Sequence, residues 1–387
     1  MSVLEWVFWI SLAIAGYAYM GYPLLLALTC RRERTPPSND GRLPAVTLFV
    51  PVRNEERVIR AKIENSLALD YPRDRLEIIV ASDGSTDRTT VIVGEYVTRG
   101  VILDAQPRWE GKNRVLNRVL PRARGEVLVF SDANAMLRPD ALRQLTRHFA
   151  DPAVGLVAGH LKYIRAKGNS TARGEALYFI YERLLKRLEG RRGAVVNANG
   201  ALYAVRKALA SPLPPEVPND FFHALYVGAR GHRVVFEPQA IVEEQATGSL
   251  REEFHRRVRI VSRSLRTVLF LVSSGEVRWG PQSFYLISHK VIRWALPFPL
   301  LVMLLTSALL PGPVYRTALL AQLVFYGLAV LGALGQRQRI LSRVCFVPFY
   351  FCLVNLAAVV GVVRCLVWRA PTVWKSAPST RIASGAP

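Results

Sequence analysis

The sequence predicts an α/β domain with a mostly parallel, doubly wound sheet, flanked by membrane-spanning helices. Between residues 45 and 238, short apolar runs alternate with helix-like stretches, the pattern of a parallel sheet. Longer apolar stretches precede and follow this region. The formal charge of +22, with 51 Lys and Arg against 29 Asp and Glu, is typical of proteins that bind membrane surfaces, nucleic acid or phosphate-bearing ligands.

The predicted elements follow one another regularly along the chain. Strands are expected at 46–50, 78–81, 101–104, 126–130 and 154–159. Helices are expected at about 56–68, 86–98, 112–121 and 139–149. Basic residues that flank membrane spans explain the positive charge more simply than nucleic-acid binding does.

The amino-terminal stretch, residues 1–30, is predicted to form a transmembrane helix. Residues 3–29 are apolar except for Glu5 and are long enough to cross a bilayer. Three arginines between 31 and 34 then predict an amino terminus outside and a cytoplasmic chain from residue 35 onward. Residues 31–44, rich in proline and polar residues, form the expected linker.

The carboxyl-terminal region, 286–368, is expected to contain about three transmembrane helices, at 291–311, 315–335 and 345–366. The Pro-Gly-Pro sequence at 311–313 predicts a tight turn between the first two. Three crossings place the tail, 369–387, outside, whereas its basic residues favour the inside, and the sequence leaves both open.

Residues 250–285 are expected to include an amphipathic helix in the membrane interface. From 250 to 272, apolar residues recur at spacings of three and four, with arginines between them. An ordinary surface helix is the alternative.

Acidic and amide side chains follow several predicted strands. The run Asp83-Gly84-Ser85-Thr86-Asp87 comes directly after the apolar run 78–81. Similar groups occupy 51–56, 131–134 and 218–220. Each segment alone is explained by a turn or a helix cap. Together they predict a shared cleft, because the carboxyl ends of parallel strands meet at one sheet edge.

These segments, in this order and spacing, resemble family 2 glycosyltransferases with the GT-A fold. The motifs are PVRNEE at 51–56, VASDGSTDRT at 80–89, GKNRVLN at 111–117, FSDAN at 130–134 and PND at 218–220. The resemblance covers about 44–275, implies a GT-A domain at 45–249, and is to the membrane-embedded branch that includes cellulose, hyaluronan and poly-N-acetylglucosamine synthases.

The resemblance implies an inverting enzyme of the inner membrane, multi-pass, with a cytoplasmic catalytic domain. Its donor would be a nucleotide sugar, preferably a UDP-sugar, and its acceptor a glycan or a lipid-linked molecule. Mg²⁺ or Mn²⁺ would assist departure of the nucleoside diphosphate. The expected partners are therefore donor, acceptor and lipid bilayer, without nucleic acid.

The resemblance also implies residue roles. Asp220 would be the general base and Asp132, with Asn134, would bind the metal. Donor binding would involve Pro51, Asn54, Glu55, Asp83, Lys112, Asp132, Arg257 and Arg259, and acceptor binding Asn199 and Gly200.

Three departures from the family pattern affect the expected function. Asn134 stands where many members have the second Asp of Asp-x-Asp, and Asn219 precedes Asp220 in place of an acid. The segment 256–260 matches Gln-x-x-Arg-Trp at Arg259 alone.

Polymer synthesis and transfer of a single sugar both stay open. A scaffold without catalysis, and a metal-dependent nucleotidyl- or phosphotransferase, are the alternatives, although the chain has no GxxxxGK[ST] motif.

Overall fold

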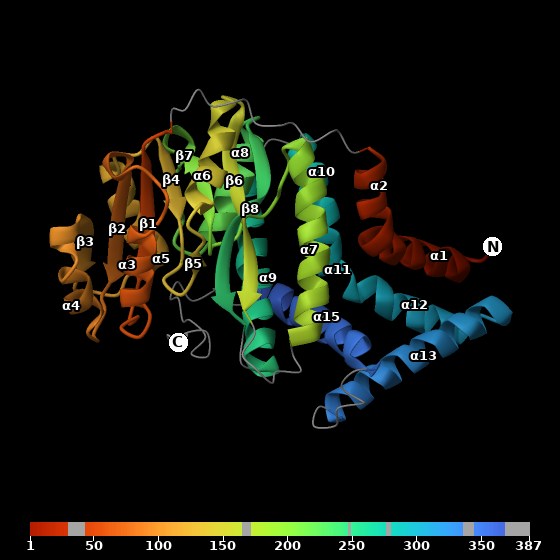
Figure 1. Ribbon diagram of the computed structural model, residues 1–387. Helices are drawn as coiled ribbons and strands as arrows, with labels where there is room; N and C mark the ends of the chain where they lie inside the picture. Colours follow the sequence, from red (N-terminus) through yellow and green to blue (C-terminus); the bar gives the residue numbers. More distant parts are fainter. Residues whose placement is uncertain (30–42, 165–171, 247–248, 276–279, 336–343, 368–387) are drawn as a thin grey trace.

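The computed structural model describes residues 1–29, 43–164, 172–246, 249–275, 280–335 and 344–367 (Figure 1). The basic segment at 31–34 and the tail lie outside these ranges, as does most of the linker. In Figure 1 the sheet and its helices form one body, and the apolar helices α1, α12 and α13 extend from one side of it.

The described residues contain an eight-stranded sheet of order β3-β2-β1-β4-β7-β6-β8-β5. The strands are β1 Val46–Val52, β2 Leu76–Asp83, β3 Val101–Gln106, β4 Val127–Phe130, β5 Met136–Leu137, β6 Val154–Ile164, β7 Tyr203–Arg206 and β8 Arg233–Gln245. All five predicted strands are confirmed, and β3, β2, β1 and β4 pair in parallel.

Strand β7 is antiparallel to both of its neighbours, β4 and β6. Its amino end therefore lies beside the carboxyl end of β4. The turn that precedes β7, residues 197–200, is thereby brought to the edge where β4 delivers residues 131–134. One reversed strand thus adds a second loop to the ligand-binding edge of a parallel sheet.

Helices cover both faces of the sheet. They are α3 Ile59–Leu67, α4 Thr89–Gly94, α5 Lys112–Val119, α6 Ala141–Thr146, α7 Ala172–Arg192, α8 Asn219–Ala229 and α9 Leu250–Ser273. Every residue of β1 is buried, because alternate side chains enter opposite layers. Leu48 belongs to the core under α3, α4 and α6, and Phe49 to the core under α5 and α8.

The apolar helices match the predicted spans in position. They are α1 Val3–Gly16 and α2 Tyr22–Leu28, joined by a π-helical turn η1 (Tyr17–Gly21), then α10 Pro281–Leu286, η7 Ile287–Val291, α11 Ile292–Ala295, α12 Pro297–Leu309, α13 Pro313–Leu334 and α15 Phe346–Val367. By length and composition, three helices of the described chain can cross a membrane, or four if the pair 281–295 and 297–309, bent by 52°, is one span.

The predicted amphipathic helix is α9, capped by Ser249, whose hydroxyl accepts a hydrogen bond from the amide of Glu252 at 3.2 Å. Part of its apolar face packs on α15. A Cβ on Gly361 would lie 2.8 Å from Cβ of Val261, so the glycine allows close approach of the two helices. Other apolar side chains of α9, including Ile260 and Leu269, are exposed.

Helix α7 is joined to the apolar helices by a buried polar network. The hydroxyl of Tyr22 donates to the carboxylate of Glu189 at 2.7 Å, and Nδ1 of His289 lies 2.6 Å from the same carboxylate. Lys290 donates to Glu182 at 3.1 Å, and Arg293 pairs with that carboxylate as well. These contacts connect helices that are far apart in the sequence.

Candidate functional site

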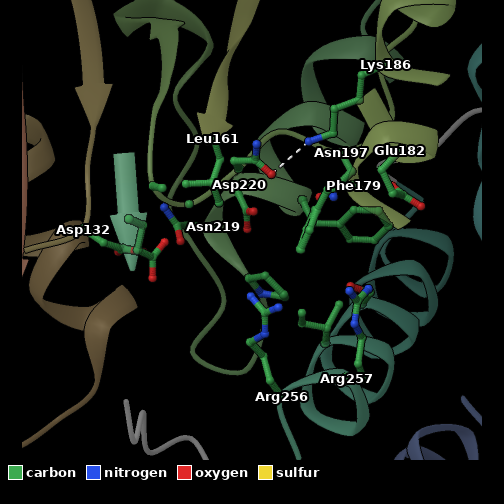
Figure 2. Close-up of a pocket in the computed structure, with 18 of the residues that line it drawn as sticks. Asp132, Leu161, Phe179, Glu182, Lys186, Asn197, Asn219, Asp220, Arg256 and Arg257 are labelled. Atoms are coloured by element: carbon green, nitrogen blue, oxygen red, sulfur yellow. Dashed lines mark hydrogen bonds between the residues drawn. The ribbon is translucent and has the colours of Figure 1, made fainter. Parts of the chain in front are cut away.

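A cavity of about 520 Å³ opens at the carboxyl edge of the sheet, between β4, α7, α8 and α9 (Figure 2). The predicted site residues that line it are Lys112, Asp132, Asn199, Gly200, Asp220, Arg257 and Arg259. Pro51, Asn54, Glu55, Asp83 and Asn134 are not among its lining residues. The structure therefore brings the predicted catalytic and acceptor residues together with part of the predicted donor set.

Asp132 follows β4 and forms an ion pair with Lys112. The ammonium of Lys112 lies 2.6 Å from Oδ1 of Asp132, and both side chains are largely buried. Lys112 is the first residue of α5 and follows Gly111, whose φ of 104° is in the region that favours glycine. Lys112 thus places a positive charge at the amino terminus of a helix, beside the carboxylate of Asp132. Helix amino termini and lysines are both suited to binding a phosphate.

Asp83 shapes the loop that leads to Lys112. Its carboxylate accepts hydrogen bonds from the side chain of Gln106 at 2.7 Å and from the amides of Glu110 and Gly111 at 2.8 and 2.9 Å. In this structure the carboxylate is therefore used to fix the 106–111 segment. Its predicted contact with a nucleoside stays a prediction.

The turns after β1 and β2 are bonded to each other. The amide of Thr86 donates to Oδ1 of Asn54 at 2.8 Å, and the amide of Glu55 donates to Thr89 Oγ1 at 2.8 Å. Asn54 has a φ of 53°, unusual for a residue other than glycine. The two predicted donor-binding turns are thus joined to each other by hydrogen bonds.

Asp220 lies in the first turn of α8 and points into the cavity (Figure 2). The N-cap of this helix is Pro218, so Asp220 is not the residue that caps it. Burial raises the pKa of Asp220, while the charges of Lys112 and Lys186 oppose this shift. A carboxylate with a raised pKa beside cations is a suitable proton acceptor.

Gly200 lies between the two carboxylates. A Cβ at this position would be 3.5 Å from Oδ2 of Asp132 and 3.9 Å from Oδ2 of Asp220. The turn before β7 thus approaches both acids with its backbone.

Asn219 lines the cavity, but its side-chain amide is bonded to a core residue. Its amide donates to the hydroxyl of Tyr203 at 2.8 Å, and that hydroxyl lies 3.0 Å from Nδ1 of His223. Burial lowers the pKa of His223 to about 4, so this imidazole is neutral at neutral pH. The network fixes the start of α8, which holds Asp220 in place.

Glu244, at the end of β8, is a site residue that the sequence analysis missed. It lines the cavity and accepts a hydrogen bond from Nδ2 of Asn134 at 2.9 Å. Burial and the nearby charge of Asp132 raise the pKa of Glu244 to about 7. The sequence did contain a signal for Glu244, because a pair of acids at 243–244 follows an apolar run. The shared cleft was predicted from the same pattern of acidic and amide side chains after apolar runs.

The oxygen atoms around Asp132 fit a hard divalent cation in type. Carboxylate and amide oxygens of the kind found on Asp132, Asn134 and Glu244 are ligands that Mg²⁺ and Mn²⁺ accept. Among the described residues, no group of three or more His, Cys, Asp or Glu is arranged to hold a metal by itself. A cation here would therefore take the rest of its coordination shell from phosphate oxygens or water.

The two arginines predicted to bind phosphate differ in their surroundings. The guanidinium of Arg257 lies 2.7 Å from Glu253, donates to the hydroxyl of Tyr350 at 3.1 Å and stacks over the ring of Tyr178 at 3.8 Å. Burial lowers the pKa of Arg259. Arg257 is thus engaged in internal contacts, and its role toward phosphate stays a prediction.

Comparison with known proteins identifies the domain that carries this site. Residues 47–208 match the family described as Glycosyl transferase family 2. This region is a glycosyl transferase family 2 domain. It contains Lys112, Asp132, Asn199 and Gly200, whereas Asp220 and the α9 arginines come from the chain that follows it.

Several curated relatives share this domain. Beta-monoglucosyldiacylglycerol synthase of Synechocystis is 32% identical over 159 residues, which are 39% of this chain and 33% of the relative. Probable glycosyltransferase YdaM of Bacillus subtilis is 27% identical over 271 residues, 65% of this chain and 64% of the relative. The chain thus matches about a third of the length of the cyanobacterial synthase.

A solved structure extends the likeness beyond the family 2 domain. Mannosyltransferase PcManGT from Pyrobaculum calidifontis, in complex with GDP-Man and Mn²⁺, superposes with a TM-score of 0.70 at 23% identity, covering 93% of this chain and 99% of the other. The predicted GT-A fold with flanking apolar helices is confirmed by this likeness.

Lys62 supports the loop that carries Asp132 and gives a testable prediction. Its buried ammonium donates to Ser131 Oγ at 2.7 Å and to the carbonyl of Ala135, and burial lowers its pKa from 10.5 to about 7. Between these two pH values the folded protein binds fewer protons at Lys62 than the unfolded chain does. The contribution of Lys62 to stability therefore rises with pH in that window.

We expect the melting temperature of the full chain in detergent to increase from pH 7 toward pH 10, and Lys62→Met to reduce this increase. Lys207→Met, at an exposed lysine, is the control. An unchanged pH dependence in Lys62→Met would contradict the assignment.

Proposed function

We propose that this chain is a membrane-bound glycosyltransferase that moves a sugar from a nucleotide-sugar donor to an acceptor hydroxyl. The observation that carries the proposal is the placement of Lys112, Asp132 and Asp220 on one cavity within and beside a family 2 domain. The named relatives are synthases and transferases, which supports the reaction class.

In the proposed reaction, Asp220 removes the proton of the acceptor hydroxyl as its oxygen attacks the anomeric carbon. The new carbon–oxygen bond forms on the face opposite the leaving group, so the anomeric configuration inverts. The bond from this carbon to the diphosphate oxygen breaks, and its electron pair departs with the nucleoside diphosphate.

Lys112 stabilises the charge that develops on the leaving diphosphate. A divalent cation held by Asp132, with Asn134 and Glu244 nearby, would neutralise the same charge. Pro51, Asn54, Glu55 and Asp83 are proposed for the nucleoside, with Arg259 toward phosphate. Asn199 and Gly200, in the turn beside both acids, are proposed to contact the acceptor.

The proposed topology places the catalytic domain on the cytoplasmic side of the inner membrane, where nucleotide sugars are made. Support comes from the arginines after the first apolar segment and from the helices long enough to cross a bilayer. The bilayer is then both anchor and possible source of the acceptor.

Asp220→Asn is expected to reduce turnover by about 10²- to 10⁴-fold, because the amide cannot accept the acceptor proton. Donor affinity should change little. Release of nucleoside diphosphate from a panel of nucleotide sugars measures turnover, and calorimetry measures donor binding. Asp74→Asn, at an exposed acid, is the matched control. Near-normal turnover in Asp220→Asn would exclude the base assignment. An unmodified protein that neither binds nor consumes any donor would favour the scaffold, whereas donor binding without turnover would indicate that the acceptor is missing from the assay.

The pH dependence of kcat/KM provides a second test. Because Lys186 lowers the pKa of Asp220, Lys186→Gln should raise that pKa. Activity is expected to fall on the acid side as Asp220 becomes protonated, and this limb should lie at higher pH in Lys186→Gln. A shift to lower pH, or no acid limb, would contradict the prediction.

Glu244→Gln tests the acid that the sequence analysis missed. The substitution keeps an oxygen that can accept from Asn134 but removes a negative charge near Asp132. We expect weaker Mn²⁺ binding in the presence of nucleoside diphosphate, measured by the electron paramagnetic resonance signal of free Mn²⁺. Glu243→Gln, at the neighbouring residue outside the cavity lining, is the control. Equal Mn²⁺ affinity in the two variants would exclude Glu244 from the cation site.

A further inference from the structure

The cavity has more positive charge than the donor chemistry requires. Among its described lining residues, nine are Lys or Arg and four are Asp or Glu. Glu243 and Glu253, outside the lining, pair with three of these cations, which leaves nine cations against six acids. A donor diphosphate arrives with a divalent cation that offsets its charge, so the positive excess indicates a second anion.

Lys186 is the cation that best marks where this anion would bind. It lines the cavity and is only 5% exposed. Its ammonium donates to two neutral oxygens, Oδ1 of Asn199 at 2.9 Å and the carbonyl of Ala198 at 3.4 Å. Burial lowers its pKa to about 8. A buried ammonium bonded to neutral oxygens gains more from an anionic ligand than an ion-paired one does.

Glu182, four residues before Lys186 on the same helix, is already paired with other cations. Glu182 pairs with Lys290 at 3.1 Å, with His289 at 3.3 Å, and with Arg293. These contacts leave Lys186 able to take an external anion without breaking a bonded ion pair.

The position of Lys186 relates the anion to the acceptor. In Figure 2, Asp220 lies between Asp132 on one side and Lys186 with Glu182 on the other. Asp220 and Lys186 are close enough that each charge shifts the pKa of the other. An anion at Lys186 is therefore on the acceptor side of the base, opposite the Lys112–Asp132 pair.

A smaller cavity of about 70 Å³ continues from this end toward the apolar helices. It shares lining residues with the main cavity, including Tyr178, Arg257 and Lys290. Its other walls include Tyr19 of η1 and Asn355 of α15. The acceptor side of the site thus shares walls with a narrow space whose other walls come from helices long enough to span a bilayer.

We propose that the acceptor is a phosphate-bearing lipid, with its hydroxyl at Asp220, its phosphate at Lys186 and its chain directed toward the smaller cavity. This inference rests on the proposed function for the identity of the base, and on charge and cavity shape for the phosphate and lipid. A neutral glycan would place no phosphate at Lys186, and a soluble phosphate ester would direct no chain toward the smaller cavity.

The test compares ligands that differ in one feature each. Calorimetry in phosphate-free detergent measures binding of short-chain phosphatidylglycerol, short-chain diacylglycerol and glycerol 3-phosphate to the full chain. We expect phosphatidylglycerol to bind about tenfold or more tightly than diacylglycerol, the range of a charge-assisted hydrogen bond. It should also bind more tightly than glycerol 3-phosphate, which lacks the acyl chains.

Lys186→Gln should abolish the preference for phosphatidylglycerol, and Lys186→Arg should retain most of it. Lys207→Gln is the matched control, because Lys207 also donates to a backbone carbonyl, that of Ala123, but outside the cavity. Binding of nucleoside diphosphate with Mn²⁺ verifies that each variant is folded.

Equal binding of the two lipids, or a preference that persists in Lys186→Gln, would overturn the phosphate site. Glycerol 3-phosphate binding as tightly as the lipid would overturn the lipid source. Failure of the proposed function is a separate outcome: no nucleotide sugar would be consumed, while the dependence of lipid binding on Lys186 would be unchanged.

Discussion

The ion pair between Lys112 and Asp132 joins two parts of the chain that must meet for the site to exist. Lys112 begins α5, after a loop fixed by the carboxylate of Asp83. Asp132 follows β4 on a turn supported from beneath by Lys62. Each residue of the pair therefore has its own buried polar support, which keeps opposite charges 2.6 Å apart beside an open cavity.

The two sides of the cavity around this pair carry different kinds of functional groups. One side combines a helix amino terminus, a lysine and oxygen ligands, all suited to a diphosphate and its cation. The other side combines a partly buried carboxylate with cations from α7 and α9. The family 2 domain supplies most of the first side and, through α7 and the turn at 197–200, part of the second. The chain beyond residue 208 adds Asp220 and the arginines of α9 to the second side. The second side is thus assembled from two parts of the sequence.

The sequence predicted much of this arrangement because strand periodicity and strand-end polarity are local signals. The five apolar runs became strands, and Asp132 and Asp220, far apart in sequence, line one cavity as expected for a shared sheet edge. Glu244 was missed because its proximity to Asp132 depends on β8 returning to the sheet. The burial of Lys186 could not be predicted for a similar reason, because the sequence around one lysine on a basic helix does not show whether that lysine is buried. The internal contacts of Arg257 depend on Tyr350 of a distant helix.

The buried network between α7 and the apolar helices joins these helices to the α/β domain that carries the cavity. Glu189 is bonded to both Tyr22 and His289, and Glu182 to Lys290 and Arg293. If the apolar helices were removed, these two carboxylates would lose their partners beside the wall that holds Lys186. The excised α/β domain would therefore need a reorganised α7, because the apolar helices hold the wall of the cavity that carries Lys186.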